Sequence, residues 1–278
     1  YYCNTSLEHA LERLFISCDK AYRNGANILI LSDRGIDENH TAIPSLLAVS
    51  ALQQYLIHTK KRTAVSIILE SAEPRSVHHF ATLLGYGATA VNPYLAHECI
   101  DELIEKGLLD RDASVAIEAY NTAVKNGVVE IAAKMGISTL QSYQSAQIFE
   151  AVGISSEVID RYFTNTISRI EGITLDDIAK TVDWLHDRGF DPMGLPTSTS
   201  LSTKGMHCLR SEAGSEDHLW DAKTILALQK AVREDSYDAF LEYADLSNHM
   251  VHPHTLRRLL DFDFSQVTPC LLYTSPSP

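Results

Sequence analysis

Apolar positions in the first sixty residues follow the two periods that distinguish helices from strands. Leu7–Arg23 carries its apolar residues three and four positions apart, which predicts an amphipathic helix. Ala26–Leu31 is a continuous apolar run, which is typical of a strand buried on both faces of a sheet. The next helix is predicted from Pro44 to His58, because proline is favoured at the start of a helix.

The same order of strand, loop and helix then recurs. A second buried strand is predicted over Thr63–Leu69, with Glu70 at its end, and a helix over Val77–Leu84. The glycine-rich residues 85–87 precede the short predicted strand Ala88–Val91, so they form a helix-to-strand turn; a phosphate loop would precede a helix. This alternation predicts parallel strands with right-handed helical crossovers, in a barrel or in an open sheet. The predicted fold class is α/β.

Helical patterns dominate the middle of the chain. A helix follows the third strand and ends near Lys106, and Ala113–Met135 has the pattern of a long helix in which Asn126-Gly127 favours a break. Two further helices are predicted over Ser155–Phe163 and Thr174–Gly189.

The stretch Lys134–Ala151, KMGISTLQSYQSAQIFEA, lies between these helices. It is predicted to hold a short strand with several hydroxyl groups, Ile137–Leu140, and to enter a new helix at Ser145. Polar side chains at the point where a strand gives way to a helix are how α/β folds build sites.

Composition changes after Gly189. Residues 191–205 are rich in Ser, Thr, Pro and Gly, which is typical of a linker. Short helices without a core of their own are predicted over Ala222–Arg233, Tyr237–Asn248 and His254–Leu260. We therefore divide the chain into residues 1–190, a linker 191–221, a helical segment 222–265 and a tail 266–278. The tail continues nothing before it, so we expect it to be non-native and the chain to be an internal fragment of a longer protein.

The composition is that of an ordinary globular protein, with 45% hydrophobic and 21% charged residues among 278. The 23 basic and 36 acidic residues give a net charge of −13, which disfavours nucleic acid and anionic membranes as partners. No apolar run approaches the roughly 20 residues of a membrane-spanning helix. Five widely spaced cysteines, an odd number, indicate reduced thiols and a cytoplasmic protein.

Polar residues gather at the predicted carboxyl ends of the strands, where parallel α/β folds place their ligands. We expect them to form a polar rim that lines a pocket or a conduit, made of Ser32, Asp33, Arg34, Glu70, Glu73, Arg75, Asn92, Ser138, Thr139, Ser142 and Tyr143.

A structural interpretation of each rim residue stands beside the functional one and is favoured for any single residue. Asp33 would then pair with Arg34 or Arg75, and Glu70 would accept backbone N–H groups at a helix start. The chain contains no G-x-S-x-G, H-E-x-x-H, Walker-type or Rossmann motif. We therefore expect no catalytic, cofactor-binding or metal-binding residue in it.

Several long, ordered stretches resemble the large (alpha) subunit of glutamate synthase. The similarity covers about Ala10–Phe264. It includes SDRGID from Ser32, IPSLLA from Ile43, VHHFATLLGYGATAVNPYLA from Val77, KMGISTLQSYQSAQIFEA from Lys134, TISRIEGITLDDIA from Thr166, TILALQKAVREDSYDAFLEYADL from Thr224 and TLRRLLDF from Thr255.

The resemblance implies a division of labour within a longer chain. An amidotransferase domain releases ammonia from glutamine, and an FMN-binding barrel with an iron–sulfur cluster combines that ammonia with 2-oxoglutarate to form glutamate. This chain is similar to the non-catalytic central domain between them, residues 1–190, and to the lead-in of the FMN-binding synthase domain, residues 222–265. The implied partners are those two domains, and a small subunit or ferredoxin for electrons. The hydroxyl groups of Ser138, Thr139 and Ser142 would line the ammonia path.

One alternative belongs to another functional class. The chain would be a free-standing α/β binding module or enzyme that holds a small ligand at its polar rim through Glu70 and Arg75.

Two positions depart from the family pattern. The family commonly has Gly where this chain has Ser145, and a Gly-Gly-Glu run where it has Ser211–His218. Serine is compatible with an ordinary helix start at position 145, because it is a favoured N-cap residue.

Overall fold

The computed structural model describes residues 1–190, 220–249, 256 and 260. The chain divides into two compact units, Tyr1–Thr197 and Ser198–Pro278, and each is described by itself. Several sequence predictions lie outside the described residues: most of the linker 191–221 with its Ser211–His218 departure, most of the helix at His254–Leu260, and the tail 266–278.

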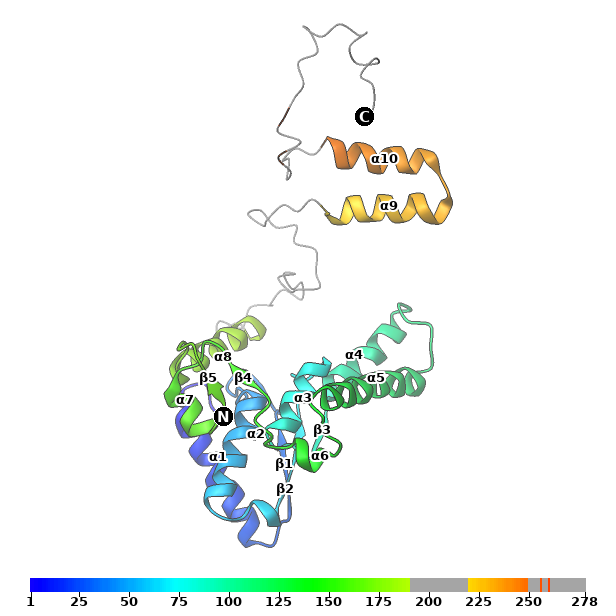
Figure 1. Ribbon diagram of the computed structural model, residues 1–278. Coiled ribbons are helices and arrows are strands. Elements are labelled where there is room, and N and C mark those ends of the chain that lie inside the picture. Colours follow the sequence, from blue (N-terminus) through cyan, green and yellow to red (C-terminus); the bar gives the residue numbers. More distant parts are fainter. Residues whose placement is uncertain (191–219, 250–255, 257–259, 261–278) are drawn as a thin grey trace, which may run out of the picture. The chain divides into compact units, whose positions relative to one another are not determined.

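The first unit is built on a small open sheet of three parallel strands (Figure 1). The strand order follows the chain and comprises β1 (Ile28–Ser32), β2 (Ser66–Glu70) and β3 (Ala90–Asn92). A helix precedes each strand: α1 (Leu7–Arg23), α2 (Ser45–His58), which leads into a short 3₁₀ turn η1 (Arg62–Ala64), and α3 (Val77–Gly85). This confirms the α/β class and the parallel strands, and the sheet is open, not a closed barrel.

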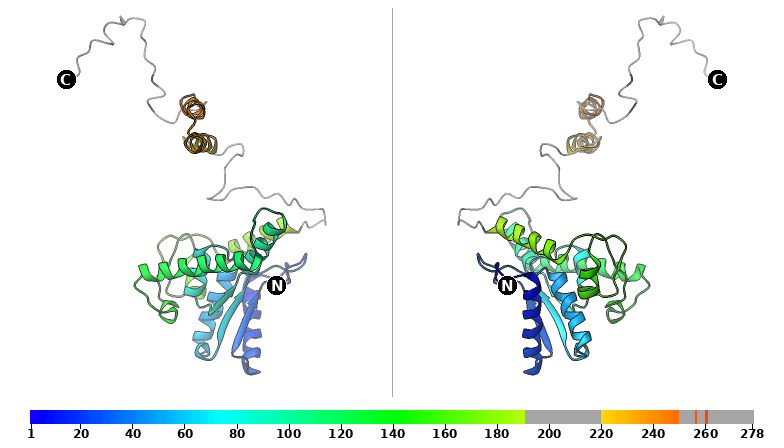
Figure 2. Two further views of the ribbon diagram at one scale, coloured as in Figure 1. Left: turned by 90° about the vertical axis from the view of Figure 1, so that its right-hand side faces the viewer. Right: turned by 90° about the vertical axis from the view of Figure 1, so that its left-hand side faces the viewer.

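The three helices cover one face of the sheet (Figure 2). Leu29, Leu31, Ile67 and Leu69 point into this face and are buried. They pack against Cys18 of α1, against α2 and against α3 in one continuous cluster, which also contains Ala48, Val49, Leu52, Leu56 and Leu83. Right-handed crossovers between strands that follow one another in one direction place every helix on the same side, which explains this layering.

The opposite face of β1 is uncovered within the described part of the chain. Burial alternates strictly along the strand, and the outward side chains of Ile28 and Ile30 are 53% and 64% exposed. The apolar run predicts a strand buried on both faces, whereas the structure buries one. The difference has a physical cause, because no element with described coordinates crosses to the other side of the sheet.

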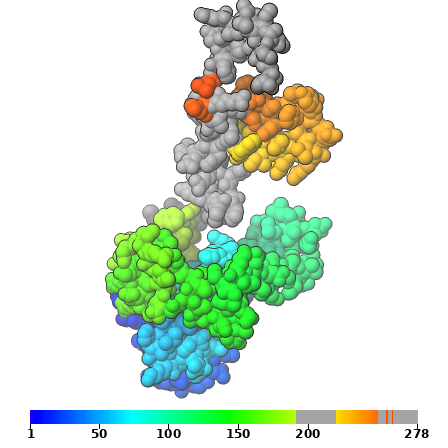
Figure 3. Space-filling view, in the orientation of Figure 1, coloured from blue at the N-terminus to red at the C-terminus, as the bar shows by residue number. Residues whose placement is uncertain are grey.

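Two helices form a hairpin that stands out from the body of this unit (Figures 1 and 3). They are α4 (Tyr94–Glu105) and α5 (Ala113–Lys134). The break predicted at Asn126-Gly127 is wrong, because α5 is continuous. Gly127 instead allows α5 to pack closely against the start of α3, because a Cβ at this position would lie 2.6 Å from both Cγ atoms of Val77.

The strand predicted over Ile137–Leu140 is also wrong. The structure has a single helical turn, α6 (Leu140–Tyr143), and the Thr139 hydroxyl caps it by accepting a hydrogen bond from the Ser142 N–H at 3.3 Å. Side-chain hydroxyls that bond to nearby backbone favour caps and turns over strands, which decides the local structure. The helix predicted from Ser145 does not form either, because Ser145 and Gln147 have φ angles of 60° and 55°.

Ser145 therefore occupies the left-handed region that L-residues adopt at a cost of roughly 1–2 kcal/mol. This conformation accounts for glycine in the family pattern at this position and contradicts the helix start expected for serine. We predict that Ser145→Gly raises the free energy of unfolding by about 0.5–1 kcal/mol, after the backbone entropy of glycine is subtracted.

Urea denaturation of the variant checks this value. The matched control is Ser142→Gly, three residues earlier, which places glycine inside α6 and should destabilise the chain by about 1 kcal/mol. A loss of stability in both variants would contradict the strain at position 145.

A second cluster closes the other end of the first unit. The two-residue strands β4 (Glu150–Ala151) and β5 (Ile167–Ser168) pair in parallel. The helices predicted nearby are confirmed as α7 (Ser156–Tyr162) and α8 (Leu175–Gly189). Their apolar faces pack against α1 and α2 around Leu7, Leu11, Leu47, Ala51, Val158, Ile159, Tyr162 and Phe163.

The second unit contains a helical hairpin that the sequence predicts closely. Its helices are α9 (Ala222–Glu234) and α10 (Tyr237–Asn248). Asp221 caps α9 by accepting a hydrogen bond from the Thr224 N–H at 2.8 Å. Little of the hairpin is buried, with Leu226 61% and Val232 73% exposed. Among the described helices, none is long and apolar enough to cross a membrane.

Candidate functional site

The structure brings three of the polar rim residues together at the carboxyl ends of the strands. Ser32, Glu70 and Asn92 are direct neighbours in the strand register. The Ser32 hydroxyl donates to Glu70 Oε2 at 2.7 Å, and the Asn92 side-chain amide donates to Glu70 Oε1 at 3.3 Å. One carboxylate thus ties the ends of all three strands to one another.

Arg34 is held over the same row. Its Nε lies 3.0 Å from Glu70 Oε1, and its Nη1 lies 3.4 Å from Glu98 Oε1. The guanidinium group also stacks on the ring of Tyr94, 3.8 Å from the ring centroid. A planar guanidinium suits both contacts, because it pairs with carboxylates and stacks on aromatic faces. The loop after β1 is therefore fastened to β2 and to the start of α4.

These contacts set the charge states of the rim. Hydrogen bonds from Ser32 and from Arg34 lower the pKa of the Glu70 carboxyl below its usual value. Burial, followed by a hydrogen bond to Asp33, raises the pKa of Tyr94 to about 12. Glu70 is therefore ionised and Tyr94 neutral near pH 7, and a carboxylate with a lowered pKa is a poor general base.

Asp33 and Glu73 act on backbone groups. Asp33 Oδ2 accepts hydrogen bonds from the Ser71 hydroxyl at 2.6 Å and from the Ala72 N–H at 2.9 Å. Glu73 accepts a hydrogen bond from the Ser45 N–H at 2.9 Å and another from the Ser45 hydroxyl, and so caps the start of α2. These contacts agree with a structural role for the rim carboxylates, but the partners differ from those expected. Arg34 pairs with Glu70 and not with Asp33, and the carboxylate at a helix start is Glu73 and not Glu70.

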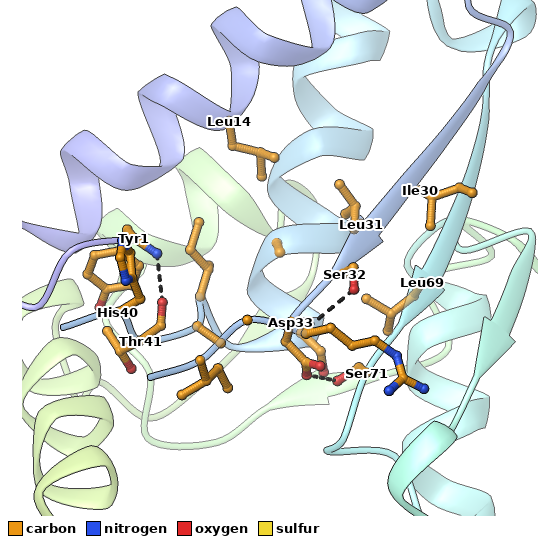
Figure 4. Close-up of a pocket in the computed structure, with 17 residues that line it drawn as sticks. Tyr1, Leu14, Ile30, Leu31, Ser32, Asp33, His40, Thr41, Leu69 and Ser71 are labelled. Carbon is orange, nitrogen blue, oxygen red and sulfur yellow. Dashed lines mark hydrogen bonds between the residues drawn. The ribbon is translucent and has the colours of Figure 1, made fainter. Parts of the chain in front are cut away.

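A cavity of about 350 Å³ lies beside these residues (Figure 4). Its walls include Leu14 of α1, Ile30 and Leu31 of β1, and the polar side chains of Asp33, Ser71 and Thr41. Arg75 lines a smaller cavity of about 300 Å³ together with Glu73 and His79. Two of the polar side chains at the first cavity already bind each other, because the Ser71 hydroxyl donates a hydrogen bond to the Asp33 carboxylate.

The stretch 138–143 is not part of this edge. The buried Tyr143 donates its hydroxyl to the Ala81 carbonyl, and Gln144 donates to the carbonyl of Ala88, which precedes β3. These contacts lie toward the amino ends of the strands. Ser138, Thr139 and Ser142 are exposed on the surface, with the Thr139 hydroxyl donating to Ser142 Oγ at 2.9 Å.

Sequence reasoning missed Tyr94, Glu98 and Ser71. Tyr94 and Glu98 lie one turn apart at the start of the helix that follows the third strand, so the i, i+4 spacing next to a strand end was the available signal. Ser71 directly follows Glu70 at the end of β2, so its position after a strand end was the available signal.

The arrangement is suited to holding strand ends and offers little for catalysis. A nucleophile needs an adjacent base, and a general base needs a pKa near the working pH. Glu70 has the opposite shift, and its partners are the strand ends themselves. Among the described residues, no group of three or more His, Cys, Asp and Glu side chains could hold a metal ion.

The lowered pKa of Glu70 predicts an acid-sensitive rim. Because its folded pKa is depressed, its stabilising contribution is complete above the ordinary carboxyl value of 4.5 and is lost as pH falls through the folded value. In Glu70→Gln, the free energy of unfolding should therefore fall less steeply than in the wild type as the pH is lowered below 4.5. Urea denaturation at a series of pH values measures it. Glu98→Gln, at the longer and more exposed contact to Arg34, is the matched control, and an equal flattening in both variants would contradict the assignment to Glu70.

Comparison with known proteins gives consistent similarities. The family described as the glutamate synthase central domain matches residues 1–155. The chain is 45% identical over 257 residues to the glutamate synthase [NADPH] large chain of Bacillus subtilis, covering 92% of this chain and 16% of that protein. It is 39% identical over 264 residues to the glutamate synthase [NADH] of Schizosaccharomyces pombe, covering 94% and 12%. The ferredoxin-dependent glutamate synthase 2 of Synechocystis is 36% identical over 288 residues, covering 94% and 18%. The chain thus spans less than one fifth of these relatives.

Proposed function

This chain belongs to the glutamate synthase central domain family, and from that premise we propose that it is the connecting part of a glutamate synthase large chain. The whole protein would convert glutamine, 2-oxoglutarate and a reductant into two molecules of glutamate. This part would hold the glutaminase and synthase sites at a fixed separation without catalysing either step.

The observation that supports this role most directly is the pairing within the rim. Glu70 binds Ser32, Arg34 and Asn92, and Asp33 binds Ser71 and a backbone N–H. Such a network stiffens the carboxyl edge of the sheet, because each charge is satisfied by a neighbouring element. A rigid edge is what a spacer between two sites requires.

The proposed layout assigns residues 1–190 to the central domain, 191–221 to a linker and 222–265 to the lead-in of the FMN-binding synthase domain. FMN and the iron–sulfur cluster would be held elsewhere in the longer chain. The names of the relatives include NADPH, NADH and ferredoxin, and we propose that the whole protein takes its electrons from a donor of one of these three classes. We propose a cytoplasmic location, because five widely spaced cysteines, an odd number, indicate thiols that stay reduced.

Ligand titration tests the connecting role against the alternative of a free-standing binding module. FMN, glutamine and 2-oxoglutarate are each titrated into the purified 278-residue chain by calorimetry. The connecting role predicts no binding at ligand concentrations up to about 1 mM. Any binding free energy would then be weaker than roughly −4 kcal/mol. Saturable binding that is lost in Glu70→Gln would favour the alternative.

A finer proposal concerns the ammonia path. We propose that the exposed hydroxyl groups of Ser138, Thr139 and Ser142 face this path in the longer chain, where neutral polar groups would pass ammonia without trapping it. In the full-length enzyme, Thr139→Trp should then release ammonia to solvent instead of passing it on to form glutamate. Thr122→Trp, at an exposed threonine on α5, is the matched control. Full coupling in Thr139→Trp would exclude the path at this residue.

A further inference from the structure

The strand and helix order leaves one place unfilled at the edge of the sheet. Helix α2 connects β1 to β2, and these two strands are neighbours in the sheet. Helix α3 connects β2 to β3 in the same way. α1 precedes β1 in the same way and packs on the same face. Among the described residues, however, no strand lies on the outer side of β1.

Within the described part of the chain, no backbone hydrogen bond reaches the outer edge of β1. The Asn27 carbonyl accepts from the Ser66 N–H at 2.9 Å, and the Asp33 N–H donates to the Glu70 carbonyl at 3.2 Å. Residues 27 and 33 therefore face β2. Since successive residues of a strand point their backbone groups to alternate sides, the N–H and C=O groups of Ile28, Ile30 and Ser32 face outward.

The same edge is apolar in its side chains. Ile28 and Ile30 are 53% and 64% exposed, and Ile30 is level with Ile68 and Ala90 across the sheet. The cavity of about 350 Å³ touches Leu14 of α1 and both Ile30 and Leu31, which point to opposite faces of the sheet (Figure 4). It therefore runs around β1 and does not lie over one face. A long, apolar, unpaired edge of this kind is a site for pairing with another strand.

We propose that a further segment of the same longer polypeptide, outside residues 1–278, adds a fourth parallel strand along the outer edge of β1. Its side chains would flank Ile28 and Ile30 on the exposed face, as the strands on either side of β2 flank Ile68, which is half-buried. Its end would close the cavity beside Ser32 and Asp33. This inference rests on the proposed membership of a full-length glutamate synthase chain, since the chain spans only 16% of its Bacillus subtilis relative. A second copy of this chain is a poorer occupant, because each copy carries a net charge of −13.

Hydrogen exchange of the full-length protein at single-residue resolution tests the added strand. We expect the amides of Ile28, Ile30 and Ser32 to exchange at least ~100-fold more slowly than unpaired amides, as do their neighbours Leu29 and Leu31, which face β2. Rapid exchange at residues 28, 30 and 32 beside slow exchange at residues 29 and 31 would overturn the proposal. Slow exchange that disappears on dilution would also overturn it, in favour of a second copy.

A pair of variants adds a readout from side chains. In the full-length protein, Ile30→Lys should lower the melting temperature and the soluble yield, whereas Ile16→Lys, at a 68% exposed position on α1, should change neither. Equal behaviour of the two variants would contradict a strand beside Ile30. Hydrogen exchange and melting temperature do not depend on glutamate formation. Absence of the fourth strand would therefore show in these two measurements, whereas absence of the connecting role would show in the ligand titration.

Discussion

Truncation of Ile67 to alanine is expected to lower the free energy of unfolding of the 278-residue chain by about 3 kcal/mol. Ile67 lies in the central strand β2, is fully buried, and packs in the cluster that joins the sheet to α1, α2 and α3. Its truncation removes buried apolar surface and leaves a cavity that the surrounding strands cannot fill. Urea denaturation followed by circular dichroism measures the change.

The matched control uses the same substitution on the other side of the sheet. Ile30→Ala changes a side chain that is 64% exposed, so only its strand propensity is lost, and the cost should be about 1 kcal/mol or less. Equal losses in the two variants would show that the helices do not cover the face assigned to them.

Substitution of Gly172 by alanine should destabilise the first unit by about 2–3 kcal/mol. A Cβ at position 172 would lie 2.7 Å from Gly153 Cα and still closer to the Gly153 carbonyl group. That backbone cannot move freely, because Gly153 N donates to the Ile170 carbonyl at 3.1 Å and Ile173 N donates to the Gly153 carbonyl at 2.9 Å. The added methyl group must therefore break the ladder beside β4 and β5.

Gly189→Ala is the control for this variant. Among the described residues, and apart from its chain neighbours and the backbone of α8 itself, no atom lies within 4 Å of a Cβ built at position 189, so the expected change is within about 0.5 kcal/mol. Thermal denaturation of both variants separates the two cases. A Gly172→Ala protein as stable as Gly189→Ala would mean that the two glycine backbones are not in close contact.

The sequence predicts the first half of the fold well. Continuous apolar runs that alternate with helical periods are a strong signal, and they correctly indicated β1, β2, β3 and the helices between them. The pairing of Ser32, Glu70 and Asn92 follows from the same signal, because the carboxyl ends of parallel strands meet at one edge. Arg34 joins them because it is two residues beyond the end of β1.

The sequence fails where short-range hydrogen bonds decide the structure. Ile137–Leu140 looks like a strand by composition, but the Thr139 hydroxyl caps a helical turn and removes it. The strands β4 and β5 have two residues each, which is too few to show any period. The contact between Arg34 and Tyr94 depends on how α4 is oriented, and such an orientation leaves no trace in local sequence.

Exposure of β1 is the other feature that sequence alone could not give. The apolar run predicts burial of both faces of this strand, whereas the structure buries one of them within its described residues. The proposed fourth strand would narrow this difference by flanking Ile30, since Ile68, which two strands flank on the same face, is half-buried.

We propose that the rim at the carboxyl edge holds the sheet together and takes no part in catalysis. This role is tested most directly by the two half-reactions of the full-length enzyme carrying Glu70→Gln: glutamine hydrolysis, and glutamate formation from added ammonia and 2-oxoglutarate. We expect a lower melting temperature and both half-reaction rates within about threefold of the wild type, well short of the roughly 100-fold loss that follows removal of an acid–base group. A loss of about 100-fold in either half-reaction at an unchanged melting temperature would contradict it.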